Sequence, residues 1–149
     1  MEIVVALGLL AVTLAVAVEL NLSLGQKVSA SGRQVKANAL AAETLEVVRI
    51  IKEKQWDDLG DLARDTDYYL SYTESNGRWA VEEENPGSIE ELFTRSFLVK
   101  DVQRDVVTGR IVGSGGEVDD RTLLVEAKIG WSEKSEAKEI KLDTYLADF

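Results

Sequence analysis

An uncharged, apolar run near the start of the chain restricts its possible folds more than any other feature. Residues 3–18 contain no charged side chain, and Glu2 stands alone at the front edge of the run. As a helix, this run would rise about 24 Å, slightly less than the roughly 30 Å hydrocarbon core of a bilayer. The run therefore predicts a short membrane-spanning helix within residues 1–24. A cleaved signal peptide is the alternative, with residues 29–31 as the nearest candidate cleavage site.

A second helical pattern covers residues 33–56, within an amphipathic segment at 25–56. Apolar side chains recur there at steps of three and four residues, and charged side chains take the other side. One stripe is therefore expected to be buried against the rest of the chain. The face expected to pack on the head consists of Leu40, Ala41, Val47, Val48, Ile51 and Trp56. Residues 19–32 are rich in glycine and serine, so the helix either softens there or continues unbroken.

The remaining residues, 57–149, predict a small antiparallel sheet. Gly60 is placed to end the preceding helix, and Asn76-Gly77 predicts a hairpin turn. Strands are expected at 67–72, 78–82, 92–104, 123–131 and 140–146, with loops at 105–121 and 132–137. Because the connections are too short for helical crossovers, the sheet is expected to be antiparallel. A helix packed across such a sheet gives an α+β fold.

Charge and composition exclude several kinds of function. Residues 57–149 carry eleven Lys/Arg against twenty-two Asp/Glu, a net charge of −11, and such a surface repels nucleic-acid phosphates. Cysteine and histidine are absent, which removes thiolate catalysis, the commonest zinc ligands and the commonest general base. We therefore predict no enzyme activity, no catalytic residue, no cofactor, no metal site and no nucleic-acid partner.

The acidic segment 117–120 is the main alternative for metal binding, because carboxylate oxygens are the ligands that calcium prefers. It lacks the regular spacing of a calcium loop, so a solvated turn is the expected structure. Residues 82–84 and 90–91 are expected to be exposed loop acids, and the glycine-rich residues 113–116 a flexible linker. Asn21-Leu22-Ser23 fits a glycosylation sequon, a match that often arises by chance.

Glu2 followed by Ile-Val-Val-Ala-Leu-Gly-Leu-Leu-Ala resembles the N-terminus of mature type IV pilins and of the pseudopilins of type II secretion systems. In that family a prepilin peptidase cuts after a glycine and the new N-terminus is methylated. The glycine and the first mature residues are absent here, which indicates that the sequence starts inside the mature chain. The resemblance implies that Glu2 is neutralised by the terminal amine of a neighbouring subunit. It also implies a filament core packed by Val4, Leu7, Leu10, Ala11 and Leu14.

The segment 40–56 resembles a recurring stretch of minor-pilin-like proteins. The matching residues are Leu40, Ala41, Glu43, Glu46, Val48, Arg49 and Trp56. For the individual side chains, core packing and solvated charge pairs remain sufficient explanations. The family architecture, one long N-terminal helix on a small antiparallel sheet, agrees with the fold expected from periodicity.

Two functions are consistent with these observations. In the first, the chain is a structural subunit of a type IV pilus-like filament, with other pilins, an assembly platform and the prepilin peptidase as partners. It would lie in the bacterial cytoplasmic membrane as a single-pass protein before assembly, and in an extracellular or periplasmic filament afterwards. In the second, it is a monomeric, membrane-anchored, extracytoplasmic binding module or enzyme whose head acts alone.

Overall fold

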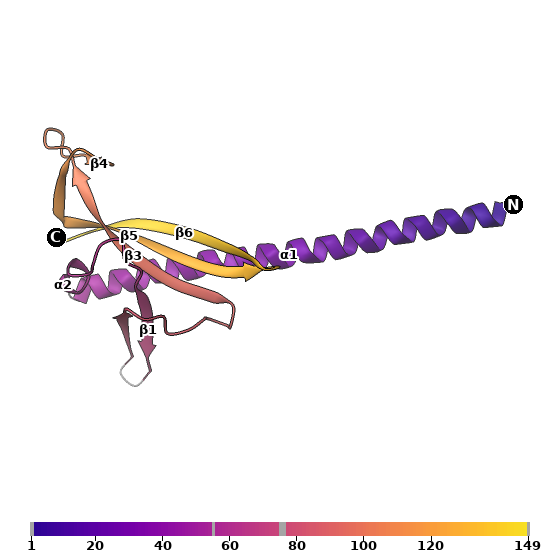
Figure 1. Ribbon diagram of the computed structural model, residues 1–149, viewed down its shortest axis with the longest axis horizontal. Helices are drawn as coiled ribbons and strands as arrows, with labels where there is room; N and C mark the ends of the chain where they lie inside the picture. The colour runs from indigo at the N-terminus through magenta and orange to yellow at the C-terminus, as the bar shows by residue number, and fades with distance from the viewer. Residues whose placement is uncertain (1, 55, 75–76, 149) are drawn as a thin grey trace. The chain divides into compact units, whose positions relative to one another are not determined.

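The computed structural model of the chain describes residues 2–54, 56–74 and 77–148, and the side chains at positions 2, 4, 5, 6 and 11 lie outside that description. The chain divides into two compact units, residues 1–36 and residues 37–149. We call them the N-terminal unit and the head. The boundary between them falls inside the predicted amphipathic segment 25–56. Figure 1 shows the elements in chain order.

One helix, α1, runs over Glu2–Lys54 and includes all of residues 19–32. Of the two alternatives for that stretch, the structure therefore shows the unbroken helix. Lys52 and Lys54 lie in the last turn of α1. Their positive charges complement the partial negative charge of the unpaired carbonyl groups at a helix C-terminus.

The end of the helical region differs from the prediction. The helix was expected to continue to Trp56 and to stop at Gly60, but α1 ends at Lys54 and a separate helical turn, α2, covers Asp57–Gly60. Gly60 does not adopt a left-handed backbone conformation. Leu59, in this extra turn, is fully buried, and burying such a side chain stabilises the turn by about 1.5–3 kcal/mol.

The head contains two antiparallel sheets (Figure 1). A hairpin of two strands comes first, and a sheet with the order β4-β3-β5-β6 follows. The hairpin strands are β1 (Tyr69–Thr73) and β2 (Arg78–Glu82). The strands of the larger sheet are β3 (Phe93–Arg104), β4 (Ile111–Val112), β5 (Glu117–Glu133) and β6 (Glu136–Ala147). The antiparallel arrangement and the α+β fold class predicted from the sequence are confirmed.

The connections within the larger sheet were predicted less well. Residues 105–121 were expected to be a loop, but β4 and the first part of β5 lie there. Residues 132–137 were also expected to be a loop, whereas β5 and β6 continue to a tight turn at Lys134 and Ser135. Both turn residues have positive φ, 50° and 69°, as in the two-residue turns that match strand twist. Neither is glycine, so the sequence gives no turn signal there.

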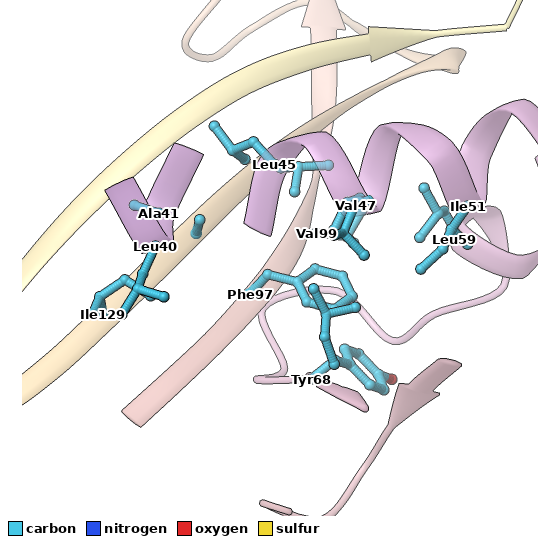
Figure 2. Close-up of a cluster of buried hydrophobic side chains, with 14 of the residues drawn as sticks. Leu40, Ala41, Leu45, Val47, Ile51, Leu59, Tyr68, Phe97, Val99 and Ile129 are labelled. Carbon is cyan, nitrogen blue, oxygen red and sulfur yellow. The ribbon is translucent and has the colours of Figure 1, made fainter. Parts of the chain in front are cut away.

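The core of the head lies between the C-terminal part of α1 and the inner face of the larger sheet (Figure 2). Phe97 and Val99 of β3 are fully buried, and the ring of Tyr68 lies 6.1 Å from that of Phe97. Five alternating residues of β5 are all buried, namely Leu123, Val125, Ala127, Ile129 and Trp131. In β6, Leu146 is buried and Leu142 is 41% exposed.

Candidate functional site

The largest group of exposed apolar side chains in the described residues lies on the N-terminal unit. We call it the N-terminal apolar surface, and each of its members is more than half exposed. It consists of Leu7, Leu9, Leu10, Val12, Leu14, Val16, Val18, Leu20, Leu22 and Leu24. A soluble monomer rarely presents so much contiguous apolar surface, so this region requires a partner or an apolar solvent.

The N-terminal apolar surface covers several sides of the helix. With 3.6 residues per turn, Leu14, Val12 and Leu20 lie at about 0°, 160° and 240° around the axis. A helix that packs on one core has a single apolar stripe, whereas a helix that is apolar all round is surrounded by protein or lipid. The geometry therefore excludes a role for this segment as an ordinary amphipathic surface helix.

The polar side chains within this apolar segment bond to the helix itself. The hydroxyl of Thr13 donates to the carbonyl of Leu10 at 2.9 Å, and the amide of Asn21 donates to the carbonyl of Ala17 at 2.8 Å. Such internal bonds reduce the free-energy penalty of placing polar groups away from water. In the structure, the amide of the possible sequon therefore faces its own helix backbone.

The unbroken helix also lengthens the possible membrane span. Glu19 is the only charged side chain in residues 3–26, a stretch that rises about 36 Å as a helix. That length exceeds the roughly 30 Å hydrocarbon core, whereas the run at 3–18 alone falls short of it. By length and composition, α1 thus contains one candidate membrane-spanning segment among the described residues.

The residues predicted to pack a filament core are only partly described. Leu7, Leu10 and Leu14 are 59%, 66% and 67% exposed, and their helical positions place them within an arc of about 60°. They form one leucine stripe on the N-terminal apolar surface. The predicted roles of Glu2, Val4 and Ala11 concern side chains that lie outside the described residues.

The face predicted to pack on the head lies in the core of the head. Leu40, Ala41, Val47, Val48 and Ile51 are at most 7% exposed. Trp56 is partly buried against the same cluster, with the ammonium of Lys52 6.0 Å from its ring. This part of α1 is therefore fixed by the sheet of its own chain.

Sequence reasoning missed an ionic contact inside the head. Arg95 interrupts the apolar face of β3, a position at which a solvated side chain would be ordinary. Its side chain is instead only 10% exposed, donates to Glu43 of α1 at 3.0 Å and lies 5.0 Å from the ring of Trp79. A basic residue at an inward strand position, with an acid on the facing helix, was the available signal.

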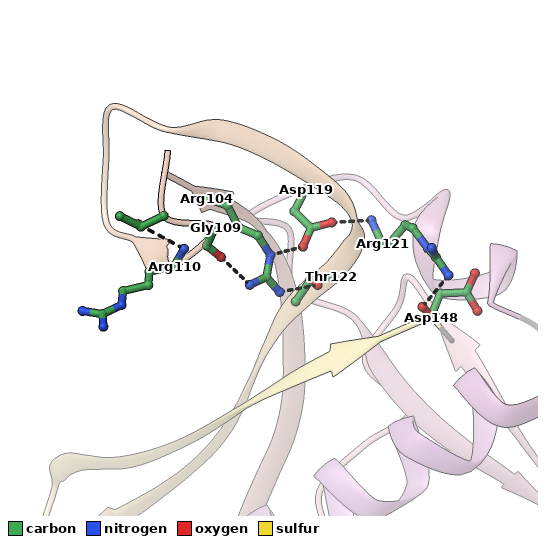
Figure 3. A network of polar contacts seen from close by, with 8 residues as sticks. Arg104, Gly109, Arg110, Asp119, Arg121, Thr122 and Asp148 are labelled. Atoms are coloured by element: carbon green, nitrogen blue, oxygen red, sulfur yellow. Dashed lines mark hydrogen bonds and ion pairs between the residues drawn. The ribbon is translucent and has the colours of Figure 1, made fainter. Parts of the chain in front are cut away.

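The acidic segment 117–120 is part of strand β5, so the expected solvated turn is wrong. Asp119 accepts a hydrogen bond from Arg104, and the guanidinium of Arg104 also donates to Gly109 and Thr122 (Figure 3). The hydrogen bond from Arg104 is the largest influence that lowers the pKa of Asp119 to about 2. No group of three or more metal-ligating side chains occurs among the described residues. This network links the C-terminal end of β3 to the first part of β5 and to Gly109.

The comparisons with known proteins add no identification. No protein-family model, no curated protein and no solved structure matches the chain. What the residues themselves establish is a long N-terminal helix, packed through its C-terminal part on an antiparallel sheet. This is an architecture like that of pilins.

Proposed function

We propose that the chain is a structural subunit of a type IV pilus-like filament, within the pilin and pseudopilin family. Its N-terminal helix would hold it in the bacterial cytoplasmic membrane and later pack against the helices of other copies. The observation that carries the proposal is the N-terminal apolar surface, exposed on several sides of a helix whose other part lies in a compact head. Such a helix needs lipid first and other helices afterwards.

The free energy of assembly in this proposal depends on more than apolar burial. Burying a leucine removes it from water with a gain of about 1.5–3 kcal/mol, but lipid tails already shield these side chains. Movement from bilayer to filament is therefore nearly neutral for the leucine stripe. A polar group must therefore determine whether the helix stays in the bilayer or enters the filament. An acid in hydrocarbon is unfavourable by about 2.5–3.5 kcal/mol. Neutralisation of Glu2 by a neighbouring subunit would relieve that penalty.

Electron microscopy and disulfide cross-linking test the proposal together. The chain has no cysteine, so a Leu10→Cys variant carries one thiol per subunit. When cells express it with its native N-terminus, material sheared from them should contain filaments, and oxidation should link subunits into dimers. Val107→Cys is the matched control, since Val107 is 89% exposed on the head and lies outside the leucine stripe. Monomers alone, with no filaments and no cross-linked dimer, would contradict the proposal.

The role of Glu2 has its own test. Glu2→Ala should abolish or strongly reduce filament yield while the protein still accumulates in the membrane fraction. Glu19→Ala is the control, because Glu19 is the other acid of the N-terminal unit. Normal filament yield in Glu2→Ala would show that assembly does not require this acid. An equal loss of filaments in both variants would show that assembly depends on the negative charge of the helix and not on Glu2 in particular.

A further inference from the structure

The head contains a cavity that the filament proposal does not use. Its volume is about 420 Å³, within the roughly 300–1,000 Å³ typical of small-ligand pockets. The apolar walls are provided by Ile51 of α1, by Tyr68, which precedes β1, and by Trp79 of β2. The carboxylates of the lining belong to Asp58 and Glu83. All five residues belong to the head, so the cavity is formed within one compact unit.

The aromatic walls of this cavity are held in place by the rest of the head. The hydroxyl of Tyr68 accepts a hydrogen bond from the backbone N–H of Ala63 at 2.9 Å. Trp79 lies beside Arg95, whose guanidinium carbon is 5.0 Å from the ring centroid. Because Arg95 is tied to Glu43 of α1, the hairpin, the sheet and the helix are linked at this point. A ligand would therefore enter a cavity whose walls are already ordered.

The charge of the cavity favours a cation. Within the described residues, neither Asp58 nor Glu83 has a hydrogen bond or ion pair from its carboxylate. Lysines on the sheet, by contrast, are paired, as in the 3.0 Å contact of Lys100 with Glu126. The head as a whole carries 14 Lys/Arg against 25 Asp/Glu, so its field also attracts positive charge.

A neighbouring hollow limits the ligand to one cationic group. It has a volume of about 350 Å³ and shares Ile51, Asp58 and Trp79 with the cavity, but it adds Lys54 and Arg78. A second positive charge would meet those two side chains. The site therefore fits one cation at the end of an apolar stem rather than a polyamine.

The strand beside the cavity points to a polypeptide as the carrier of that cation. Strand β2 pairs with β1 on one side only, and within the described residues its other edge has no partner strand. Three consecutive β2 residues, 79–81, line the cavity. The cavity therefore lies against β2 over this stretch. Edge strands of this kind bind extended peptides by adding a strand.

We propose that the head binds an extended, basic segment of another polypeptide. The segment pairs with the free edge of β2 and places one lysine side chain in the cavity, with the ammonium at Asp58 and Glu83 and the stem against Tyr68 and Trp79. This inference is independent of filament formation, because it concerns the head alone.

Nuclear magnetic resonance of the full chain in neutral maltoside micelles tests the proposal. The probes are the peptide acetyl-Thr-Lys-Thr-amide, its norleucine analogue, butylamine and spermidine. The lysine peptide should shift the indole N–H signal of Trp79 and leave that of Trp131 unchanged. The norleucine peptide, which keeps the stem but loses the charge, should bind about tenfold more weakly, a difference of roughly 1.4 kcal/mol. Spermidine should show no advantage over butylamine.

The outcomes of the probe series separate the alternatives. Equal binding of the two peptides would overturn the cation site, and equal binding of butylamine and the lysine peptide would overturn strand addition. A spermidine affinity well above those of butylamine and the lysine peptide would overturn the single-cation site, because diffuse attraction to the acidic head would explain it. An unchanged Trp79 signal at millimolar lysine peptide would reject the site.

A pair of charge-matched variants locates the binding. Asp58→Asn combined with Glu83→Gln should weaken lysine-peptide binding about tenfold, because both of the exposed carboxylates that attract the ammonium lose their charge. Asp61→Asn combined with Glu84→Gln removes the same charge from neighbouring residues that do not line the cavity. This control should change the affinity less than twofold. Equal weakening in both double variants would assign the effect to net charge and overturn the site.

Discussion

Leu14 and Leu40 lie on the same helix, α1, yet Leu14 is 67% exposed and Leu40 is 6% exposed. The difference follows from the residues around them. Near Leu40, charged side chains occupy the outer face and a single stripe meets the sheet, whereas the N-terminal unit is apolar on several sides. The head therefore buries one apolar stripe of α1 in its own core, whereas the apolar side chains of the N-terminal unit are exposed on several sides.

The comparison also teaches where the stability of the folded chain is located. The head has a core, paired charges and constrained turns, so substitutions there should change its free energy of unfolding. The side chains of the N-terminal apolar surface are each more than half exposed, so substitutions there should change partitioning and assembly instead. Each variant below tests this division, in order of decreasing expected effect.

The largest effect is expected from a cavity in the core of the head. Phe97 is fully buried, so Phe97→Ala should lower the free energy of unfolding by about 3–5 kcal/mol. Leu10→Ala removes an exposed side chain of the N-terminal unit and should change the same quantity by less than about 0.5 kcal/mol. Denaturant unfolding in micelles, followed by near-ultraviolet circular dichroism, measures both. A similar loss in Leu10→Ala would mean that the two units unfold together.

The reverse pattern is expected for membrane partitioning. Val12→Asp places a charge within the apolar segment and should weaken membrane insertion by about 3 kcal/mol, or roughly 100-fold. Flotation with liposomes gives the bound fraction. Val107→Asp, a control on an exposed valine of the head, should leave that fraction unchanged. Full membrane binding of the Val12→Asp variant would contradict insertion of this segment into the bilayer.

A glycine of the head provides a steric test. A Cβ atom at Gly116 would clash with the backbone oxygen of Arg104, whereas one at Gly113 or Gly8 would meet nothing within 4 Å. Gly116→Ala should therefore lower the stability of the head by about 1–3 kcal/mol. Gly113→Ala in the same loop and Gly8→Ala in the N-terminal unit should leave it nearly unchanged. Thermal unfolding of the three variants measures these changes, and an unchanged stability of Gly116→Ala would contradict the steric clash.

The turn between β5 and β6 should be open to improvement. Lys134 and Ser135 both have positive φ, which is unfavourable for residues with a side chain. Replacing them by Asn and Gly, the preferred pair for such a turn, should raise the stability of the head by about 0.5–1 kcal/mol. Ser132→Gly within β5 should lower it, because glycine weakens a strand. No gain from the turn variant would count against the tight turn.

The smallest effect concerns acid titration of the head. The pKa of Asp119 is lowered to about 2, first by the hydrogen bond from Arg104. A lowered folded-state pKa stabilises the fold above the ordinary value of 3.8, and this contribution is lost as pH falls through about 2. Arg104→Gln should raise the pKa of Asp119 towards 3.8, as measured by carboxyl carbon resonances. The pKa of Asp105 is lowered first by the backbone N–H of Thr108 and then by its hydroxyl, so Thr108→Val, which removes only the hydroxyl, should raise that pKa in part.

Much of the head was predictable because its signals are local. The alternation of Leu123 to Trp131 and the three- and four-residue steps around Val48 depend only on nearby residues. The start of β5 was missed because aspartate disfavours strands by itself, and pairing with Arg104 overrides that preference. The Arg95 contact and the cavity beside Trp79 were missed because they join residues far apart in the sequence.

The sequence by itself determined that an uncharged apolar run at residues 3–18, predicted to be helical, precedes an acidic segment with the alternating pattern of strands and without cysteine or histidine. Those conclusions depend on composition and on periods of two and 3.6 residues, which are properties of neighbouring residues. Only the tertiary structure decided which acids are paired, which part of α1 packs in the core, and that one edge of β2, among the described residues, has no partner strand. These features depend on which distant segments come into contact, and periodicity carries no information about that.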